Sequence, residues 1–454
     1  MSDQRLSDQR LSDAEGLMWR LGTDPFLSST FANVTVCSGE PDLARLRYRL
    51  ERASLLMPRL RQRVSDRGQP TWEEDPYFDV ARHVKVVDLP RNSSMRAAFD
   101  LATLAASVPF DTRRPLWEFT LIRGLRGDRS IVVQKMHHCV ADGEASLQLS
   151  LHFLDFASGA VDPPMPTAEQ IATATAAFVG AAPTLGGQAV KSSMTLARQV
   201  LELLSDPVRL PAAGQAVMNT ARALVAPMLD NARSTLWRSR STARHLEALQ
   251  VPLDPVLNAA KRLGATLNIA FLTAAAEAAG RYHRELGHEV ETLRASMAIS
   301  TRTKASGGNA FTLARLSVPT REMTVSERFQ TIAGAADAAR REASAAGGGL
   351  DSLASLAANV PTPALTRLAR AQAQTVDFAT SNLRAAPFPM YIAGARVDRN
   401  HPIGPLAGVA FNLTLMSYCG SLDMGLNVDT AAIERPALLR KLLIDAFRRL
   451  GRAT

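Results

Sequence analysis

The 454 residues are more than one ordinary hydrophobic core accommodates, so two domains are expected. The sequence is 46% apolar and 21% charged, which is typical of a folded protein and excludes a largely disordered chain. Its net charge of +9 favours a polyanionic partner, either an anionic membrane surface or a phosphate-rich cofactor. Nucleic acid is not expected, because there is no zinc-finger spacing, RNA-recognition signature or arginine-rich tail.

The N-terminus and the cysteines indicate a cytosolic chain. The first residues repeat a polar pentapeptide and lack the apolar stretch of a secretory signal, so a frayed terminus is expected. Cys37, Cys139 and Cys419 lack the spacing of a metal site or a disulfide, and Cys37 and Cys419 are expected to be buried. The uncharged stretches at 170–190 and 402–422 contain too few large apolar residues for a transmembrane span, and none is predicted.

The first third of the chain alternates helical and strand patterns. Residues 42–64 carry apolar side chains at helical spacing, and strand-like pieces follow at 84–87, 118–122 and 130–135. The last of these has an apolar β-branched run and is expected to be a buried central strand.

A helix is expected soon after that strand. Gly143 interrupts the chain, and from Glu144 onward Leu147, Leu151 and Leu154 form one apolar stripe. The histidine pair at 137–138 is therefore predicted to lie where a central strand ends and a loop begins.

Residues 159–241 are rich in alanine and contain two amphipathic segments. They are expected to form a helical connection between a first domain at 1–158 and a second domain at 242–454. Such helices either dock on both domains or contribute a tunnel wall or a membrane-touching face. The second domain is expected to begin with helices at 254–263 and 268–282 and a strand at 295–300. A hairpin formed by 409–415 and 422–428 and a final helix at 436–450 are expected to follow.

The strongest candidate for chemistry is the run that begins with His137-His138 and ends with Asp142-Gly143. Motifs of serine hydrolases, nucleotide-binding enzymes and zinc proteases are absent. Neighbouring side chains at a strand end point to opposite faces, so the two histidines are expected to differ in role. A neutral histidine can accept a proton from an alcohol, Asp142 can hold the loop by pairing with an arginine, and Gly143 permits a tight backbone path. The competing interpretation is a metal-binding pair or two core histidines.

Further blocks of the sequence share a pattern with a known family. They are Pro58 to Arg63, Asp75 to Pro90, Pro115-Leu116-Trp117, Thr380 to Leu383, Ala393 to Arg396 and Asn412 to Gly420. The histidine motif resembles that of the coenzyme A-dependent acyltransferase superfamily. With the other blocks, the chain resembles the bacterial wax ester synthase/diacylglycerol acyltransferase family over nearly its whole length.

The resemblance implies an α/β fold with two chloramphenicol acetyltransferase-like domains, mixed sheets flanked by helices, and an active-site channel between the domains. It implies that His138 is the general base, with support from His137 and Asp142. The substrates would be acyl-CoA and the hydroxyl of a diacylglycerol or a long-chain alcohol. Acyl-CoA would act as a co-substrate, without a bound cofactor, a metal or a covalent enzyme intermediate. No residue is assigned to CoA binding from the sequence.

Asn268, Ser381 and Asn382 are candidate oxyanion donors, or alternatively caps at helix and strand ends. The family usually has Asn-Asp where this chain has Asn268-Ile269, which favours the alternative of a weakly active paralogue that binds lipid and CoA. A condensing acyltransferase acting on a polyketide or a carrier-bound substrate is a further alternative. Because the implied acceptors partition into membranes or lipid droplets, the chain is expected to be cytoplasmic and peripherally associated with such a surface.

Overall fold

The computed structural model describes residues 9–66, 70–141, 143–180, 234–300, 311–345, 357 and 360–453. The helices are α1 (Asp13–Gly22), α2 (Leu43–Leu56), η1 (Pro58–Arg61), α3 (Val80–His83), α4 (Met95–Ser107), α5 (Gly143–Phe153), α6 (Ala168–Gly180), α9 (Leu253–Arg262), α10 (Leu267–Glu285), α11 (Val325–Ala345), α13 (Thr362–Ala373) and α14 (Pro436–Gly451). The strands are β1 (Gln9–Arg10), β2 (Thr30–Ser38), β3 (Gln62–Ser65), β4 (Thr71–Glu74), β5 (Val84–Ser93), β6 (Trp117–Leu125), β7 (Arg129–His137), β8 (Leu154–Asp155), β9 (Arg244–Pro252), β10 (Thr292–Ser300), β11 (Phe311–Pro319), β12 (Phe378–Arg384), β13 (Tyr391–Ile392), β14 (Ala395–Ile403), β15 (Phe411–Tyr418) and β16 (Ser421–Asp429).

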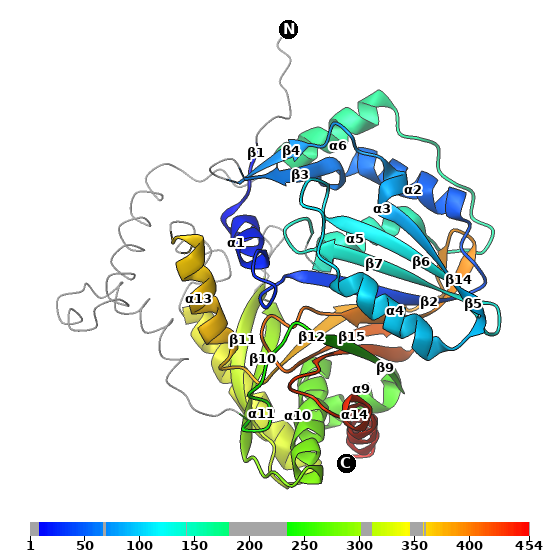
Figure 1. Cartoon of the computed structure of the whole chain (residues 1–454). Helices are drawn as coiled ribbons and strands as arrows, with labels where there is room; N and C mark the ends of the chain where they lie inside the picture. Colours follow the sequence, from blue (N-terminus) through cyan, green and yellow to red (C-terminus); the bar gives the residue numbers. More distant parts are fainter. Residues whose placement is uncertain are drawn as a thin grey trace, which may run out of the picture.

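The first large sheet has seven strands in the order β5-β6-β7-β2-β14-β13-β8. Figure 1 shows β5, β6, β7, β2 and β14 of this sheet, with α2 and α4 nearby. Both faces of this sheet are covered. Successive side chains of the central strand β7 point to opposite faces, and both sets are buried. Ile131 and Val133 pack with α4, whereas Val132 and Met136 join the apolar cluster that contains α2 and α5. This burial on both faces confirms the buried central strand expected at 130–135 and places its end at the histidine pair.

Strands β13 and β14 come from the C-terminal part of the chain but complete this first sheet. β14 pairs antiparallel with β2, from Arg396 opposite Ser38 to Ile403 opposite Ala32. The sheets therefore do not follow a simple division of the chain at residue 241, and the predicted domain boundaries stay predictions.

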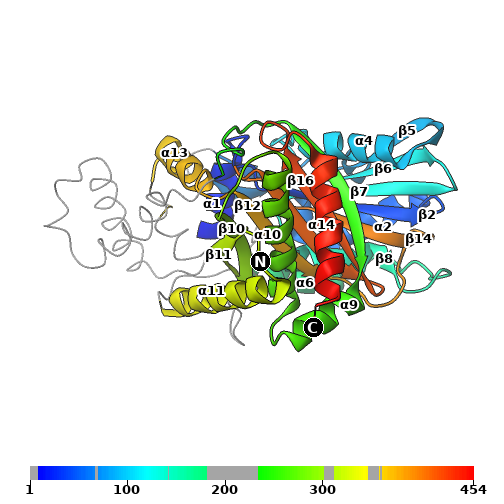
Figure 2. The same ribbon diagram turned by 90° about the horizontal axis from the view of Figure 1, so that it is seen from below.

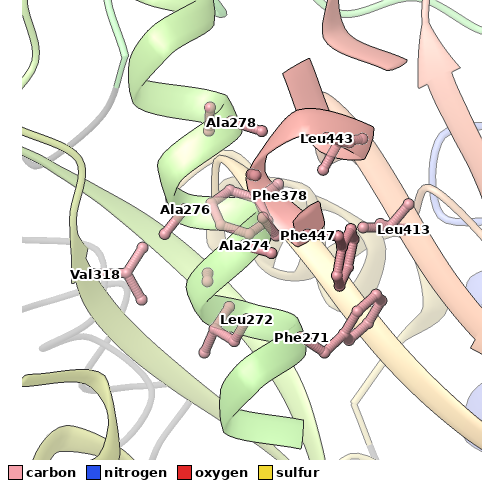
Figure 3. Close-up of a cluster of buried hydrophobic side chains, with 14 of the residues drawn as sticks. Phe271, Leu272, Ala274, Ala276, Ala278, Val318, Phe378, Leu413, Leu443 and Phe447 are labelled. Atoms are coloured by element: carbon pink, nitrogen blue, oxygen red, sulfur yellow. The ribbon is translucent and has the colours of Figure 1, made fainter. Parts of the chain in front are cut away.

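The second large sheet has six strands in the order β11-β10-β12-β15-β16-β9, with α10, α11 and α14 lying beside it (Figure 2). In its core the rings of Phe271 and Phe447 face each other (Figure 3), with 6.0 Å between their centroids. The rings of Phe378 and Phe411 stack with 4.8 Å between their centroids. The buried alanines of α10 keep this helix narrow, so that strand and helix side chains pack closely against it. Among the described residues, no single helix is long and apolar enough to cross a membrane, and only the bent pair α9–α10 passes that test when taken together.

The two large sheets meet where β14 packs against β15 and β16. The backbone N–H of Asn400 donates to Oδ2 of Asp423 at 2.9 Å, and Nδ1–H of His401 donates to the carbonyl of Met424 at 3.1 Å. A Cβ on Gly425 would stand 2.0 Å from the carbonyl oxygen of Pro402, so only glycine permits this approach. The junction joins both halves of the chain through β14.

Several expected elements are confirmed, and three expectations are wrong. The hairpin β15–β16 turns through Cys419 and Gly420, which both have positive φ, as a two-residue hairpin turn requires. Cys419 is therefore exposed in the turn and is not buried as expected, whereas Cys37 is buried. The helix expected over 42–64 ends at Leu56, because Pro58 begins a 3₁₀ turn and the next residues form strand β3.

The third error concerns the buried stripe of α5. Leu151 was expected to face inward but is 56% exposed, and Leu149 and Phe153 are buried in its place. Both sets of residues have helical spacing, so periodicity alone does not choose between them. The two amphipathic segments predicted for the connection lie within 181–233, outside the described residues.

Candidate active site

His138 lies directly after the end of β7, beside the start of β2. Its backbone N–H donates to the carbonyl of Ser29 at 3.2 Å, and its ring packs against Phe31 with 4.6 Å between the centroids. Within the described part of the chain, the imidazole has no hydrogen-bond partner. Although part of its surface is accessible, the surrounding protein lowers the pKa of His138 to about 4 by desolvation. The imidazole is consequently neutral at pH 7.

His137 is buried and turned toward the protein. Its Nδ1 accepts the backbone N–H of Cys139 at 3.2 Å, and the Cys139 thiol lies 2.9 Å from the same nitrogen. A backbone N–H can only donate, so Nδ1 is unprotonated and the hydrogen of the neutral ring is on Nε2. Desolvation, with a contribution from the neighbouring His138, lowers the pKa of His137 to about 4. His137 thus holds the turn that presents His138.

Helix α1 closes the site behind His137. Trp19 meets the His137 ring edge-on at 6.4 Å, and Gly22 ends the helix against the same ring. No sequence motif marks Trp19 or Gly22 as a residue of the site. The same holds for Ser29 and Phe31, so sequence analysis did not find these four contacts of the histidine pair. Their role follows from the pairing of Thr30 with His137, which brings β2 and the preceding segment to the motif.

The remaining residues of the motif are less informative. The helix expected from Glu144 is confirmed, and α5 begins one residue earlier, at Gly143. Asp142 lies outside the described residues, so its predicted support of the loop stays a prediction. In the described ranges, no group of three or more His, Cys, Asp or Glu side chains is placed to hold a metal ion.

The second group of candidates gathers at one place beside the second sheet. Asn268, Ser381 and Asn382 line a small pocket with Phe271, Met297 and Thr380. Nδ2 of Asn382 donates to Oδ1 of Asn268 at 2.5 Å, so the helix start of α10 and the strand β12 are joined by their amides. The cavity is about 10 Å³, close to the space of one water molecule. Neither histidine lines it.

Ile269 does not face this pocket. It is 5% exposed and belongs to the hydrophobic core of the second sheet. Isoleucine in place of the family's aspartate at position 269 therefore changes the core beside the pocket and leaves the pocket's polar lining as it is.

Comparison with known proteins identifies the family. Residues 15–271 match the family model "Wax ester synthase/diacylglycerol acyltransferase catalytic domain", and residues 307–451 match "WS/DGAT C-terminal domain". The chain belongs to the wax ester synthase/diacylglycerol acyltransferase family. As a member of this family it is an acyltransferase, and the resemblance inferred from its motifs is confirmed.

Individual relatives of this acyltransferase agree with the family assignment. The chain is 30% identical to a Mycobacterium tuberculosis (strain CDC 1551 / Oshkosh) protein that carries the name of a diacylglycerol O-acyltransferase, over 98% of this chain and 91% of that protein. The wax ester synthase/diacylglycerol acyltransferase from Marinobacter aquaeolei VT8 superposes with a TM-score of 0.65 at 21% identity, covering 97% and 98% of the two chains. A starter condensation domain of rhizomide synthetase, solved in complex with C8-CoA, superposes with a TM-score of 0.56 at 16% identity, covering 98% and 96%. The two-domain α/β fold expected for this acyltransferase is confirmed.

Proposed function

We propose that this acyltransferase moves a fatty acyl group from acyl-CoA to the hydroxyl of a diacylglycerol, and also to long-chain alcohols, with His138 as the general base. The observation that carries the proposal is a neutral and partly accessible imidazole at the end of a buried strand, held there by backbone contacts. The diacylglycerol O-acyltransferase name of the M. tuberculosis relative supports the acceptor. The C8-CoA held by the structurally similar condensation domain supports the donor.

His138 removes the hydroxyl proton while the oxygen attacks the thioester carbonyl. The new C–O bond forms, the C–S bond breaks, and the CoA thiolate takes the proton from the imidazolium. An imidazole with a pKa of about 4 is a weak base, so proton removal must be concerted with C–O bond formation. The same low pKa makes the imidazolium an effective acid toward a thiolate, whose conjugate thiol has a pKa of ~8.5.

The tetrahedral intermediate needs hydrogen-bond donors for its oxyanion. Asn268, Ser381 and Asn382 supply amide and hydroxyl donors at one pocket, and we assign this role to them. Because Oδ1 of Asn268 accepts from Asn382, the Asn268 amide is oriented with Nδ2 away from that bond. This orientation leaves Nδ2 to donate to a substrate oxygen.

Release of CoA thiol from acyl-CoA in the presence of dioleoylglycerol tests the proposed reaction. The wild-type chain should release thiol and form triacylglycerol, and His138→Ala should lower the rate by ~10² to 10⁴-fold. His138→Gln separates the loss of the base from the loss of the side chain, because it keeps the polarity of the ring. Equal rates for the wild type and both variants would overturn the assignment of the base.

The same assay separates the proposed function from its two alternatives. A carrier-bound substrate requires a carrier protein, so turnover of free acyl-CoA and dioleoylglycerol without a carrier argues against a condensing enzyme. A weakly active paralogue would bind CoA without thiol release. Since Ile269 packs in the core, its presence does not remove a polar group from the pocket, which favours the active enzyme.

We also propose that the chain is cytoplasmic and associates peripherally with a membrane or lipid-droplet surface. Phe156 and Phe388 support this proposal, since they are 56% and 46% exposed and their rings are 5.5 Å apart. The net charge of +9 adds attraction to anionic lipids. When phosphatidylserine vesicles are sedimented at low salt, the wild type should be found in the pellet with the vesicles. The double variant Phe156→Ser/Phe388→Ser should stay in the supernatant. Tyr77→Ser, at a side chain that is 73% exposed, is the matched control.

A further inference from the structure

A second pocket lies between segments from both halves of the chain. It is lined by Phe26, Leu27, Arg238, Arg240, Arg370, Ala373, Gln374 and Gly408. These residues come from the segment before β2, the segment before β9, the end of α13 and the segment before β15. The cavity is about 220 Å³, against about 10 Å³ for the pocket at Asn268, so it has room for a ligand group.

Arg370 is held in place at the rim of this pocket. Its Nε donates to Oδ2 of Asp24, and its Nη2 donates to Oδ1 of the same carboxylate at 2.7 Å. The guanidinium of Arg370 also lies 4.5 Å from the centre of the Phe26 ring. Burial acts to raise the pKa of Asp24, but the hydrogen bonds from Arg370 and Phe26 lower it, so the pair is ionised. The fixed guanidinium loses little side-chain freedom when it meets an anion.

The other two arginines add positive charge. Nε of Arg240 donates to the carbonyl of Gly408 at 2.8 Å, and Nη1 donates to that of Ser239 at 3.0 Å, which fixes this guanidinium also. Arg238 is exposed, and the described residues offer it no ion-pair partner. None of the eight lining residues is acidic. Asp24 offsets the charge of Arg370, so the positive charge of the pocket comes from Arg238 and Arg240.

The pocket is close to the proposed base. Leu27 precedes Ser29 by two residues, and the carbonyl of Ser29 accepts the backbone N–H of His138 at 3.2 Å. Two residues of extended chain span at most ~7 Å. A ligand group in the pocket and a reacting group at His138 can therefore belong to one molecule.

We propose that this pocket binds the phosphate groups of the acyl-CoA donor. The inference rests on the proposed function and assigns a binding site for one of its two substrates. The guanidinium of Arg238 matches phosphate oxygens in charge and in the geometry of its paired N–H donors. Nε and Nη2 of Arg370 already bind Asp24, so Arg370 contributes its remaining nitrogen. Diacylglycerols and long-chain alcohols carry no charge, so the donor is the substrate that needs such a site. Its pantetheine arm carries the thioester from the phosphates toward His138.

The test compares acyl-CoA with acyl-pantetheine, which lacks the phosphates of CoA together with its adenosine. Acyl-CoA and the corresponding acyl-pantetheine are assayed with dioleoylglycerol in the wild type, Arg238→Ala and Arg238→Glu. The ratio of kcat/KM for acyl-CoA to kcat/KM for acyl-pantetheine should fall about tenfold in Arg238→Glu and less in Arg238→Ala. Arg452→Glu, at an exposed arginine after α14, makes the same charge change and should leave the ratio at its wild-type value.

Binding of unacylated CoA by calorimetry gives a measurement that does not depend on turnover. The Kd should rise about tenfold in Arg238→Glu, and the salt dependence of binding should weaken, because one charge contact is lost. Equal ratios and equal Kd values in Arg238→Glu and Arg452→Glu would overturn the proposed site. Absence of wild-type turnover with either donor would instead refute the proposed function, while the calorimetry would still decide whether this pocket binds CoA.

Discussion

Gly22 and His137 are in contact across the end of helix α1. A Cβ placed on Gly22 would stand 2.5 Å from Nε2 of the His137 ring, which is closer than real Cβ contacts come. On the other side of the ring, Nδ1 is held by the backbone N–H of Cys139. The His137 side chain is therefore confined between the end of α1 and its own turn, and the position of His138 depends on both.

Gly22→Ala should lower kcat because it displaces His137 and tilts the turn that carries His138. We expect a loss of ~10-fold or more, since small misplacements of a catalytic group are costly. Gly16→Ala is the matched control in the same helix, because a Cβ there meets nothing within 4 Å. It should stabilise the protein by ~0.5 to 1 kcal/mol and leave kcat as it is. Equal kcat values for the two variants would contradict the proposed support of His138.

Activity should persist to unusually low pH. A base with a pKa of about 4 is fully neutral well below pH 6.5, so kcat/KM should fall only near pH 4. The measurement is a pH profile of kcat/KM for acyl-CoA, with aliquots returned to pH 7 to correct for unfolding. An acidic limb near the ordinary histidine pKa of ~6.5 would show that His138 is not buried in the working enzyme.

Stability should fall as the pH falls from ~6.5 toward 4. Desolvation lowers the pKa of His401 to about 4, outweighing its hydrogen bond to Met424, whereas the unfolded chain has the ordinary value of ~6.5. The unfolded state therefore binds more protons between these values, and the stability present above pH 6.5 is lost on acidification.

His401→Asn isolates this contribution, because the asparagine amide can replace the Nδ1–H donor but does not titrate. Its free energy of unfolding should fall less steeply with acid, by up to ~1.4 kcal/mol per pH unit, in urea titrations at pH 4.5 to 6.5. Parallel curves for the wild type and the variant would exclude His401 as the source.

Restoring the family's acid at position 269 should harm this protein. Ile269 lies in the core, where a carboxylate has no partner from the apolar cluster, so Ile269→Asp should lower the free energy of unfolding by roughly 3 kcal/mol or more. Ile269→Val, the control, should cost about 0.5 to 1.5 kcal/mol. Denaturant midpoints and thiol-release rates check both. A stable and faster Ile269→Asp enzyme would show that the acid faces the pocket.

Asn268 and Asn382 should act as one unit in catalysis. Asn268→Ala and Asn382→Ala should each lower kcat by ~10² to 10³, as removal of an oxyanion donor does. The double variant should lose little more, because each single change already breaks the shared hydrogen bond. Rates at saturating acyl-CoA measure this effect. Lower melting temperatures with unchanged kcat would favour the alternative role as helix and strand caps.

Elements with a strong local pattern were predictable from the sequence. The terminal hairpin was found because alternating apolar residues flank Cys419-Gly420, and helix α14 because Leu439, Leu443 and Phe447 share one face. The insertion of β14 beside β2 was not predictable, since that pairing joins segments near opposite ends of the chain. The stripe of α5 was predicted wrongly at Leu151 because two apolar stripes compete in the same helix.

By itself, the sequence determined the family, the acyltransferase activity and the position of His138 at the end of a buried strand. Each rests on residue identity or on spacing along the chain, which report local structure directly. Only the tertiary structure decided that Gly22 confines His137, that Asn268 meets Asn382, and that Ile269 turns into the core. These contacts join residues distant in the chain, and long-range packing selects them among many pairings that the local patterns equally allow.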